Sequence, residues 1–166
     1  MGRTDWGLAK LSNGAWQIFN QANSGLTDNS IRALDTDSQN NIWIGTTLGG
    51  LFKFDGNNWT QYNSANSDIP CDFIRAITVD STDQIWIGTI EGLSLFDGSQ
   101  WQNWSIANSG ILSNNITSIR QGKNGMMHVA TINGGVYYIQ NGVLTNYTLL
   151  QNGVPDNTNL SVQVDN

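Results

Sequence analysis

A short pattern of apolar, aromatic and small residues recurs along the chain and predicts its architecture. The segment Ile42–Thr46 reads Ile-Trp-Ile-Gly-Thr, Ile85–Thr89 repeats the same five residues, and Met127–Thr131 keeps their character in a weaker form. The copies follow one another every 42–43 residues. A fixed period of this length is the signature of a repeat protein, in which each repeat forms one structural unit.

Each repeat contains four short apolar runs with polar turns between them. An Asx-Gly pair stands between the last two runs of each repeat, which is a strong β-hairpin signal. Since no stretch shows a sustained helical period, the pattern predicts antiparallel strands. The first run of each repeat lies at Ile31–Leu34, Ile74–Val79, Ile116–Ile119 and Leu160–Val164.

Four-stranded antiparallel units that repeat every ~40–45 residues are typical of β-propeller blades. We therefore predict an all-β chain that folds as one domain, residues 1–166, with four blades. The predicted blade pieces are 1–20 with 159–166, 21–63, 64–105 and 106–158. Large residues at equivalent positions would pack between blades, where glycines allow close approach. This predicted repeat core comprises Trp43, Trp86, His128, Trp16, Trp59, Trp101, Gly45 and Gly88.

The two ends of the chain together hold the parts of one further blade. The C-terminal residues align with the first strand of a repeat, and Met1–Thr4 aligns with Ile44–Thr47 inside the Trp motif. Two closures fit: the termini clasp one blade of a four-bladed ring, or two chains exchange termini in an eight-bladed ring. We favour the first because one chain holds every piece. A slice of a longer natural propeller is the third alternative.

Composition and charge exclude several function classes. Charged residues make up 12% of the chain and the net charge is −6, with no basic stripe, so nucleic acid is not an expected partner. No apolar run reaches the ~20 residues needed to span a membrane. Cys71 is the lone cysteine, which leaves no disulfide framework. The abundance of Asn, Ser and Thr suits a periplasmic or extracellular surface.

The order Trp-Ile-Gly-Thr, Gly-Leu, Asp-Gly and Trp within each repeat resembles the two-component regulator propeller repeats. The match covers Ile31–Tyr62 and Ile74–Trp104 well and the flanking repeats in part. Such repeats occur in periplasmic sensor regions of bacterial hybrid two-component systems, so the resemblance implies a propeller and, as one alternative, ligand sensing by one of its faces. This chain departs from the pattern at His128, Val129 and Ala130, where Trp, Ile and Gly are expected.

The sequence offers little for catalysis or metal binding. His128 is the one histidine and the obvious general-base candidate, yet it occupies the tryptophan position of a repeat and is interpreted as a packing residue. The run Asp35–Gln39 begins like a calcium loop but lacks the Gly and the acidic ligand that such loops require. We expect no metal and no cofactor, and we interpret Asp37 and Asp80 as caps of the turn before each Trp motif.

Ligands of propellers usually bind on the face that carries the loops before the inner strands, so we expect a ligand site on that face. Arg32 and Arg75 begin inner strands in adjacent blades, and two guanidinium groups beside a channel mouth can fork onto a carboxylate or sulfate. The expected neighbours are Asn29, Asp72, Asn115 and Glu91. The competing interpretation is that the arginines form rim salt bridges with Asp72 or Glu91.

These observations leave three functional hypotheses. The favoured one is a non-enzymatic binding or interaction module for an anionic small molecule or a glycan. The second is a structural propeller fragment or assembly unit without a ligand. The third is a propeller lyase, which would require His128 to be accessible beside a carboxylate. Under any of them the protein would be a monomer or a propeller-completing homodimer.

Overall fold

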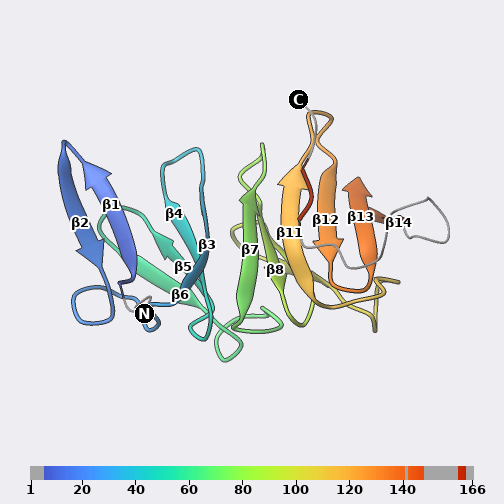
Figure 1. Ribbon diagram of the computed structural model, residues 1–166, viewed down its shortest axis with the longest axis horizontal. Coiled ribbons are helices and arrows are strands. Elements are labelled where there is room, and N and C mark those ends of the chain that lie inside the picture. The colour runs from blue at the N-terminus through green and yellow to red at the C-terminus, as the bar shows by residue number, and fades with distance from the viewer. Residues whose placement is uncertain (1–5, 141, 148–160, 164–166) are drawn as a thin grey trace.

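The computed structural model describes residues 6–140, 142–147 and 161–163, and these contain fourteen β-strands. The strands form four antiparallel sheets that stand side by side in a row (Figure 1). None of the described residues belongs to a helix long and apolar enough to cross a membrane. The arrangement is the all-β, blade-like architecture that the repeats predict.

The sheets follow the repeats in chain order. The first sheet has two strands, β1 (Leu8–Ser12) and β2 (Ala15–Phe19). The second holds β3 (Ile31–Thr36), β4 (Ile42–Thr46), β5 (Leu51–Phe54) and β6 (Trp59–Tyr62). The third holds β7 (Ile74–Val79), β8 (Ile85–Thr89), β9 (Leu93–Phe96) and β10 (Trp101–Trp104). The fourth holds β11 (Ile116–Gln121), β12 (Met127–Thr131), β13 (Gly135–Gln140) and β14 (Val143–Tyr147).

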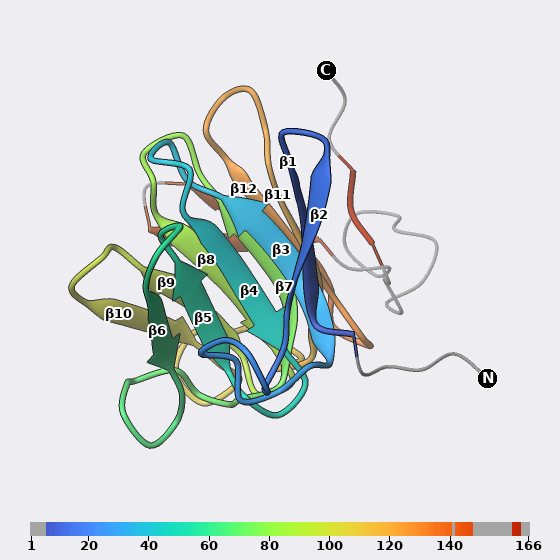
Figure 2. The same cartoon turned by 90° about the vertical axis from the view of Figure 1, so that its left-hand side faces the viewer.

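Each four-stranded sheet is a simple meander, because every strand pairs with the strand next to it in the chain. The first strands of the sheets, β3, β7 and β11, lie next to one another. Figure 2 shows the outer strands β6 and β10 lying away from β3 and β7. The inner strands of neighbouring blades therefore form a common inner surface, and the outer strands form the rim.

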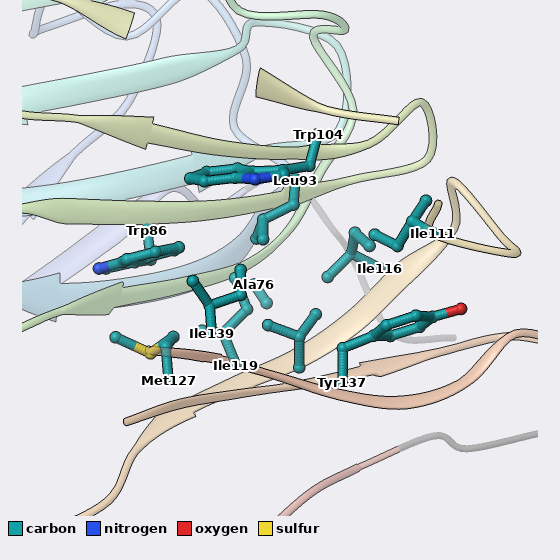
Figure 3. Close-up of a cluster of buried hydrophobic side chains, with 11 residues drawn as sticks. Ala76, Trp86, Leu93, Trp104, Ile111, Ile116, Ile119, Met127, Tyr137 and Ile139 are labelled. Atoms are coloured by element: carbon teal, nitrogen blue, oxygen red, sulfur yellow. The ribbon is translucent and has the colours of Figure 1, made fainter. Parts of the chain in front are cut away.

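Large apolar side chains hold the blades together. They point from one face of each sheet, and the residues between them along the strand point from the other face. Trp43 of β4 is buried against the third sheet, and Trp86 of β8 is buried against the fourth. Figure 3 shows the second of these interfaces, where Trp86 and Trp104 face Met127 and Tyr137 across the gap between sheets. The Trp86 and Trp104 rings are stacked, with their centres 5.5 Å apart.

Asp37 and Asp80 cap the turns before β4 and β8, as predicted, and they also bind the buried tryptophans. The Asp80 carboxylate accepts hydrogen bonds from the Trp86 indole N–H at 2.9 Å and from the backbone N–H of Gln84 at 3.0 Å. Asp37 accepts the equivalent bond from Trp43 at 3.0 Å. Each buried indole thus has the acceptor that it needs, because an unpaired N–H in the core would be costly.

One residue of the predicted repeat core differs from expectation, and most of the predicted ring closure lies beyond the described residues. Trp16 was predicted to be core, but its side chain is 68% exposed because no described sheet covers that face of β2. The predicted strand Leu160–Val164 is described only at residues 161–163, which form no strand. The other pieces of the predicted clasp, residues 1–5 and 164–166, lie outside the described residues, so ring closure stays a prediction.

Candidate functional site

The candidate site lies on the inner strands, where the same irregularity recurs in three sheets. The pairing register of β3 with β4 shifts between Ile31 and Ala33, and the equivalent shifts in the next two sheets bracket Arg75 and Thr117. A β-bulge of this kind leaves one residue out of the ladder and redirects its side chain. Arg32 and Arg75, the two arginines predicted to bind a ligand, therefore lie at bulges and take no part in the regular strand pairing.

Phe73, which directly precedes β7, brings the two arginines to one place. The guanidinium carbon of Arg32 lies 5.2 Å from the centre of the Phe73 ring, and that of Arg75 lies 5.5 Å from it. Contacts at this distance are cation–π interactions, which hold a cation without neutralising its charge. One aromatic ring thus orients two positive groups from adjacent blades.

The two guanidinium groups keep most of their hydrogen-bonding capacity. Arg32 donates from Nε to the Thr47 hydroxyl oxygen at 3.1 Å. The Nε of Arg75 is buried and has no hydrogen-bond partner. Among the described residues neither arginine forms an ion pair, so the alternative of rim salt bridges with Asp72 or Glu91 is not what the structure contains.

A hollow of about 340 Å³ lies along these inner strands. Its polar lining comes from all three bulged strands and from one described residue near the C-terminus, and comprises Arg32, Arg75, Thr117, Ser118, Arg120 and Ser161. None of the described residues that line it carries a carboxylate side chain. A second hollow of about 490 Å³ shares Arg32 and is lined by Trp6, Asn29 and Thr47. The two hollows therefore meet at Arg32.

Asn29 and Asp72 are placed near the arginines but serve their own loops. The Asn29 side-chain oxygen accepts a hydrogen bond from the backbone N–H of Gln21 at 2.8 Å, and Asp72 accepts one from Ser64 at 2.8 Å. These bonds span eight residues in both repeats and close the loop that precedes the inner strand. The two residues shape the rim of the site rather than present free side chains to it.

In the fourth sheet, the hydrogen bond equivalent to those of Asn29 and Asp72 is made by Asn114 and not by Asn115, the residue that was predicted. Asn114 accepts from the backbone N–H of Ile106 at 2.7 Å. Asn115 instead occupies the position of Phe73, one residue before the inner strand, and its side-chain oxygen is buried without a hydrogen-bond partner. Glu91 lies exposed in the turn between β8 and β9, and its backbone N–H donates to Thr89.

Sequence reasoning missed three residues of the site. Phe73 and Arg120 do not repeat, since the equivalent positions hold Ser30 and Asp35, so the repeat pattern gave no signal for them. Trp6 precedes the first recurring Gly-Leu pair and has no repeat partner among the aromatic positions. An aromatic residue beside an arginine at the start of an inner strand was the available clue for Phe73.

His128 does not form a catalytic arrangement with the described residues. It lies in β12 opposite Arg120 and Tyr138, half-buried, and burial lowers the pKa of its imidazole. The described residues contain no group of three or more His, Cys, Asp or Glu side chains that could hold a metal ion. No described sheet packs against His128, so its interpretation as a packing residue in the tryptophan position stays a prediction.

Comparison with known proteins supports the assignment made from the repeats. Residues 25–47 and 68–91 match the model of the two component regulator propeller. No curated protein sequence matches the chain significantly. Among solved structures, the chain resembles the extracellular domain of BT3049 from B. thetaiotaomicron, described as a hybrid two component system, with 27% identity over 87% of this chain and a TM-score of 0.70.

Two further structures extend the comparison. The extracellular domain of BT4673 from B. thetaiotaomicron, described as a one component system, matches with 21% identity over 96% of this chain and a TM-score of 0.72. A catalytically inactive virginiamycin B lyase from Staphylococcus aureus shares the fold, with 13% identity over 84% of this chain, 47% of that chain and a TM-score of 0.64.

The chain spans only about a fifth of the two extracellular domains, 20% of one and 22% of the other. The predicted propeller fold and the resemblance are both confirmed by these matches. This protein is therefore a β-propeller chain in which residues 25–47 and 68–91 match the two component regulator propeller, and it resembles extracellular domains of bacterial two-component system proteins.

Proposed function

We propose that this propeller is a non-enzymatic binding module that takes an anionic ligand over the Arg32–Arg75 pair. The observation that carries the proposal is the buried, unpartnered Nε of Arg75 beside a second arginine on the same phenylalanine ring. Buried donors in folded proteins are nearly always paired, so a lone one at the wall of a hollow calls for an acceptor from outside the chain.

The charge of the hollow favours a carboxylate or sulfate. Arg32, Arg75 and Arg120 all line it, and its described lining residues include no acidic side chain. A guanidinium group presents a planar fork of donors that matches the oxygens of such anions, and these charge-assisted bonds are about twice as strong as neutral ones. The net charge of −6 makes this positive inner surface a local exception on an acidic molecule.

Trp6 supports a sugar acid as the specific form of the anion. Its side chain is exposed and lines the neighbouring hollow together with Arg32. An exposed indole offers an apolar face to a sugar ring, while the arginines would take the carboxylate. The relation to extracellular domains of two-component systems supports a sensor role outside the cytoplasm for a protein that contains this propeller.

A lyase function is less well supported than binding. The likeness to the virginiamycin B lyase is a likeness of fold at 13% identity. His128 lacks a carboxylate neighbour among the residues whose positions are described, and burial alone accounts for the lowering of its pKa. A general base needs a partner that orients it, and the described part of the chain supplies none to His128.

Calorimetric titration with inorganic sulfate, glucuronate and neutral glucose tests the proposal. We expect saturable binding of both anions and weaker or no binding of glucose. Arg75→Gln and Arg32→Gln should each weaken anion binding by about tenfold or more, because each removes a charge-assisted hydrogen-bond donor. Trp6→Ala should weaken glucuronate while leaving sulfate nearly unchanged.

Lys123→Gln is the matched control, since it removes one positive charge from an exposed turn outside the hollow. It should bind both anions like the unmodified chain. Absence of saturable anion binding would overturn the proposal, and so would an Arg75→Gln variant that folds normally and keeps full affinity.

A further inference from the structure

A third hollow, of about 340 Å³, lies between the third and fourth sheets beside the turn before β8. Among the described residues, it shares no lining side chain with the two hollows that meet at Arg32. Its floor is apolar, because Trp86 of the third sheet and Met127 and Ile139 of the fourth are buried there (Figure 3). Two neighbouring sheets therefore form a candidate site that is separate from the arginine pair.

The same place in the other two interfaces between sheets is filled by a pair of stacked aromatic rings. Each pair comes from the third and fourth strands of the following sheet, and the ring centres are 4.5 Å apart in both. The pairs are Phe54 with Trp59 and Phe96 with Trp101. In the fourth sheet, Ile139 and Leu144 hold the two positions. Since two aliphatic side chains occupy less volume than two rings, the chain leaves part of the space between these sheets unfilled.

The cation that covers this place in the preceding interface is replaced as well. Lys53 of β5 lies over the Trp43 ring, with Nζ 5.4 Å from the ring centre. Leu95 of β9 holds the Lys53 position in the third sheet, since each of the two pairs with the tryptophan of its own sheet. The described residues that line the hollow include no Lys or Arg side chain. The hollow therefore has an apolar wall where the preceding interface has a charged group.

A neutral amide joins the two sheets at the rim of the hollow. The side-chain oxygen of Gln121 accepts a hydrogen bond from the backbone N–H of Ser81 at 2.9 Å. In the preceding interface the carboxylate of Asp83 accepts the equivalent bond from Ser38 at 2.9 Å, and Gly125 holds the Asp83 position in the fourth sheet. The carboxylate that joins the preceding pair of sheets is thus replaced by an uncharged group.

Gln102 of β10 offers a hydrogen-bonding group at the rim. Its side chain is exposed, and its amide forms no hydrogen bond within the described part of the chain. It pairs with Leu95, so its side chain stands on the same face of the sheet as the apolar wall. Asp80 also lines the hollow, but its carboxylate is hydrogen-bonded to the Trp86 indole and to its own turn. The hollow thus combines an apolar floor with an amide that can donate and accept.

We propose that this hollow binds a neutral aromatic ring that carries a hydroxyl or N–H group, as in a phenol or an indole. The ring would lie in the space that Phe96 and Trp101 fill in the preceding interface, and its polar group would bond the Gln102 amide. Apolar cavities between packed side chains accept small aromatic rings. A neutral ligand fits because the described lining has no cation and its one carboxylate is already hydrogen-bonded.

Calorimetric titration with p-cresol, indole, toluene and glucose tests this inference. We expect saturable binding of p-cresol and indole, weaker binding of toluene, which lacks the polar group, and no binding of glucose in this hollow. The double variant Ile139→Phe with Leu144→Trp rebuilds the ring pair and should weaken p-cresol binding by about tenfold or more, because it fills the space. Gln102→Ala should weaken p-cresol binding by about threefold to tenfold and leave toluene binding unchanged.

Gln39→Ala is the matched control, since it removes the same kind of amide from an exposed turn outside the hollow. It should bind p-cresol like the unmodified chain, and circular dichroism should show that every variant keeps its strands. Absence of saturable p-cresol and indole binding would overturn the inference. So would full p-cresol affinity in a folded double variant, or equal p-cresol affinity in Gln102→Ala and Gln39→Ala. Sulfate binding at Arg75 uses other residues, so the proposed function is tested independently of these outcomes.

Discussion

Strands β8 and β12 are two copies of one motif, and they differ at the positions that face the following sheet. In β8, Trp86 is buried against the fourth sheet, and the backbone at Gly88 lies against Ile116. In β12 the same positions hold His128 and Ala130, and no described strand packs beyond them. Both strands nevertheless pair normally with their neighbours.

The turns before the two strands differ in the same way. In the third sheet Asp80 binds the Trp86 indole, whereas the fourth sheet has Gly122 in place of the aspartate. The turn backbone is the same in both: Asp80 N–H donates to Gln84 at 2.9 Å, and Gly122 N–H donates to Met126 at 2.8 Å. The carboxylate is thus not required for the turn itself.

The comparison separates two roles within one short motif. Strand formation survives in β12 without Trp, Gly or the preceding Asp. The three residues of β8 and its turn instead serve the contact with the next sheet: the indole fills it, the glycine leaves room for it, and the aspartate pairs the buried indole N–H. Where that contact is not made by a described sheet, all three are replaced together.

The largest expected effect comes from truncating the tryptophan position in the two strands. Trp86→Ala should lower the free energy of unfolding by about 3–5 kcal/mol, since it empties a buried site between sheets. His128→Ala should cost less than about 1 kcal/mol, because the imidazole is half-buried and fills no described interface. Urea denaturation measures both. Equal losses would mean that β12 packs as β8 does.

Substitutions at the glycine position of the motif, Gly88 in β8 and Ala130 in β12, should show a smaller difference in stability between the two strands. A methyl group on Gly88 would lie 2.6 Å from the Ile116 methyl carbon, so Gly88→Ala should cost about 1–3 kcal/mol through overpacking. The reciprocal change, Ala130→Gly, should cost only about 0.5–1 kcal/mol from added backbone freedom. Thermal unfolding of the pair checks this. A neutral Gly88→Ala variant would contradict the close approach of the two sheets.

The aspartate should matter where it has an indole to bind. Asp80→Ala leaves the buried Trp86 N–H without an acceptor, with an expected cost of about 1–3 kcal/mol in chemical denaturation. Placing the carboxylate in the fourth sheet, Gly122→Asp, should bring no comparable gain, because His128 stands where the indole would be. If Gly122→Asp stabilised the chain as much as Asp80→Ala destabilised it, the carboxylate would act on the turn alone.

The smallest expected effect is the loss of stability in acid, where the Asp80 carboxylate becomes protonated. Burial tends to raise the pKa of Asp80, but bonds from Trp86, Thr82 and Gln84 outweigh it and leave the pKa below the ordinary 3.8. Since the folded-state pKa is the lower one, the stabilisation is complete above 3.8 and is lost as the pH falls through the folded-state value. The melting temperature of Asp80→Ala should therefore fall less between pH 7 and the acid range than that of the unmodified chain. Parallel curves would argue against this linkage.

The site was only partly accessible from the sequence. Arg32 and Arg75 could be found because they recur at the start of inner strands, and the bulges explain why those positions are special. Phe73 and Arg120 could not be found, because a repeat pattern identifies equivalent positions and these residues have no equivalents. Asn115 was chosen over Asn114 by a shift of one residue, which the loop hydrogen bonds resolve.

The order of short apolar runs and Asx-Gly turns was enough to specify the strands, their pairing within each sheet and the period of the blades, because these depend on residues close together in the chain. Which faces meet, and which stay open, depends on contacts between residues some forty positions apart. Trp16 and Trp59 occupy the same repeat position. Of the two, Trp59 alone has a described sheet beside it, where it lies 5.6 Å from the Phe19 ring. The same holds for the two arginines, whose charges are brought to one ring only when adjacent blades stack.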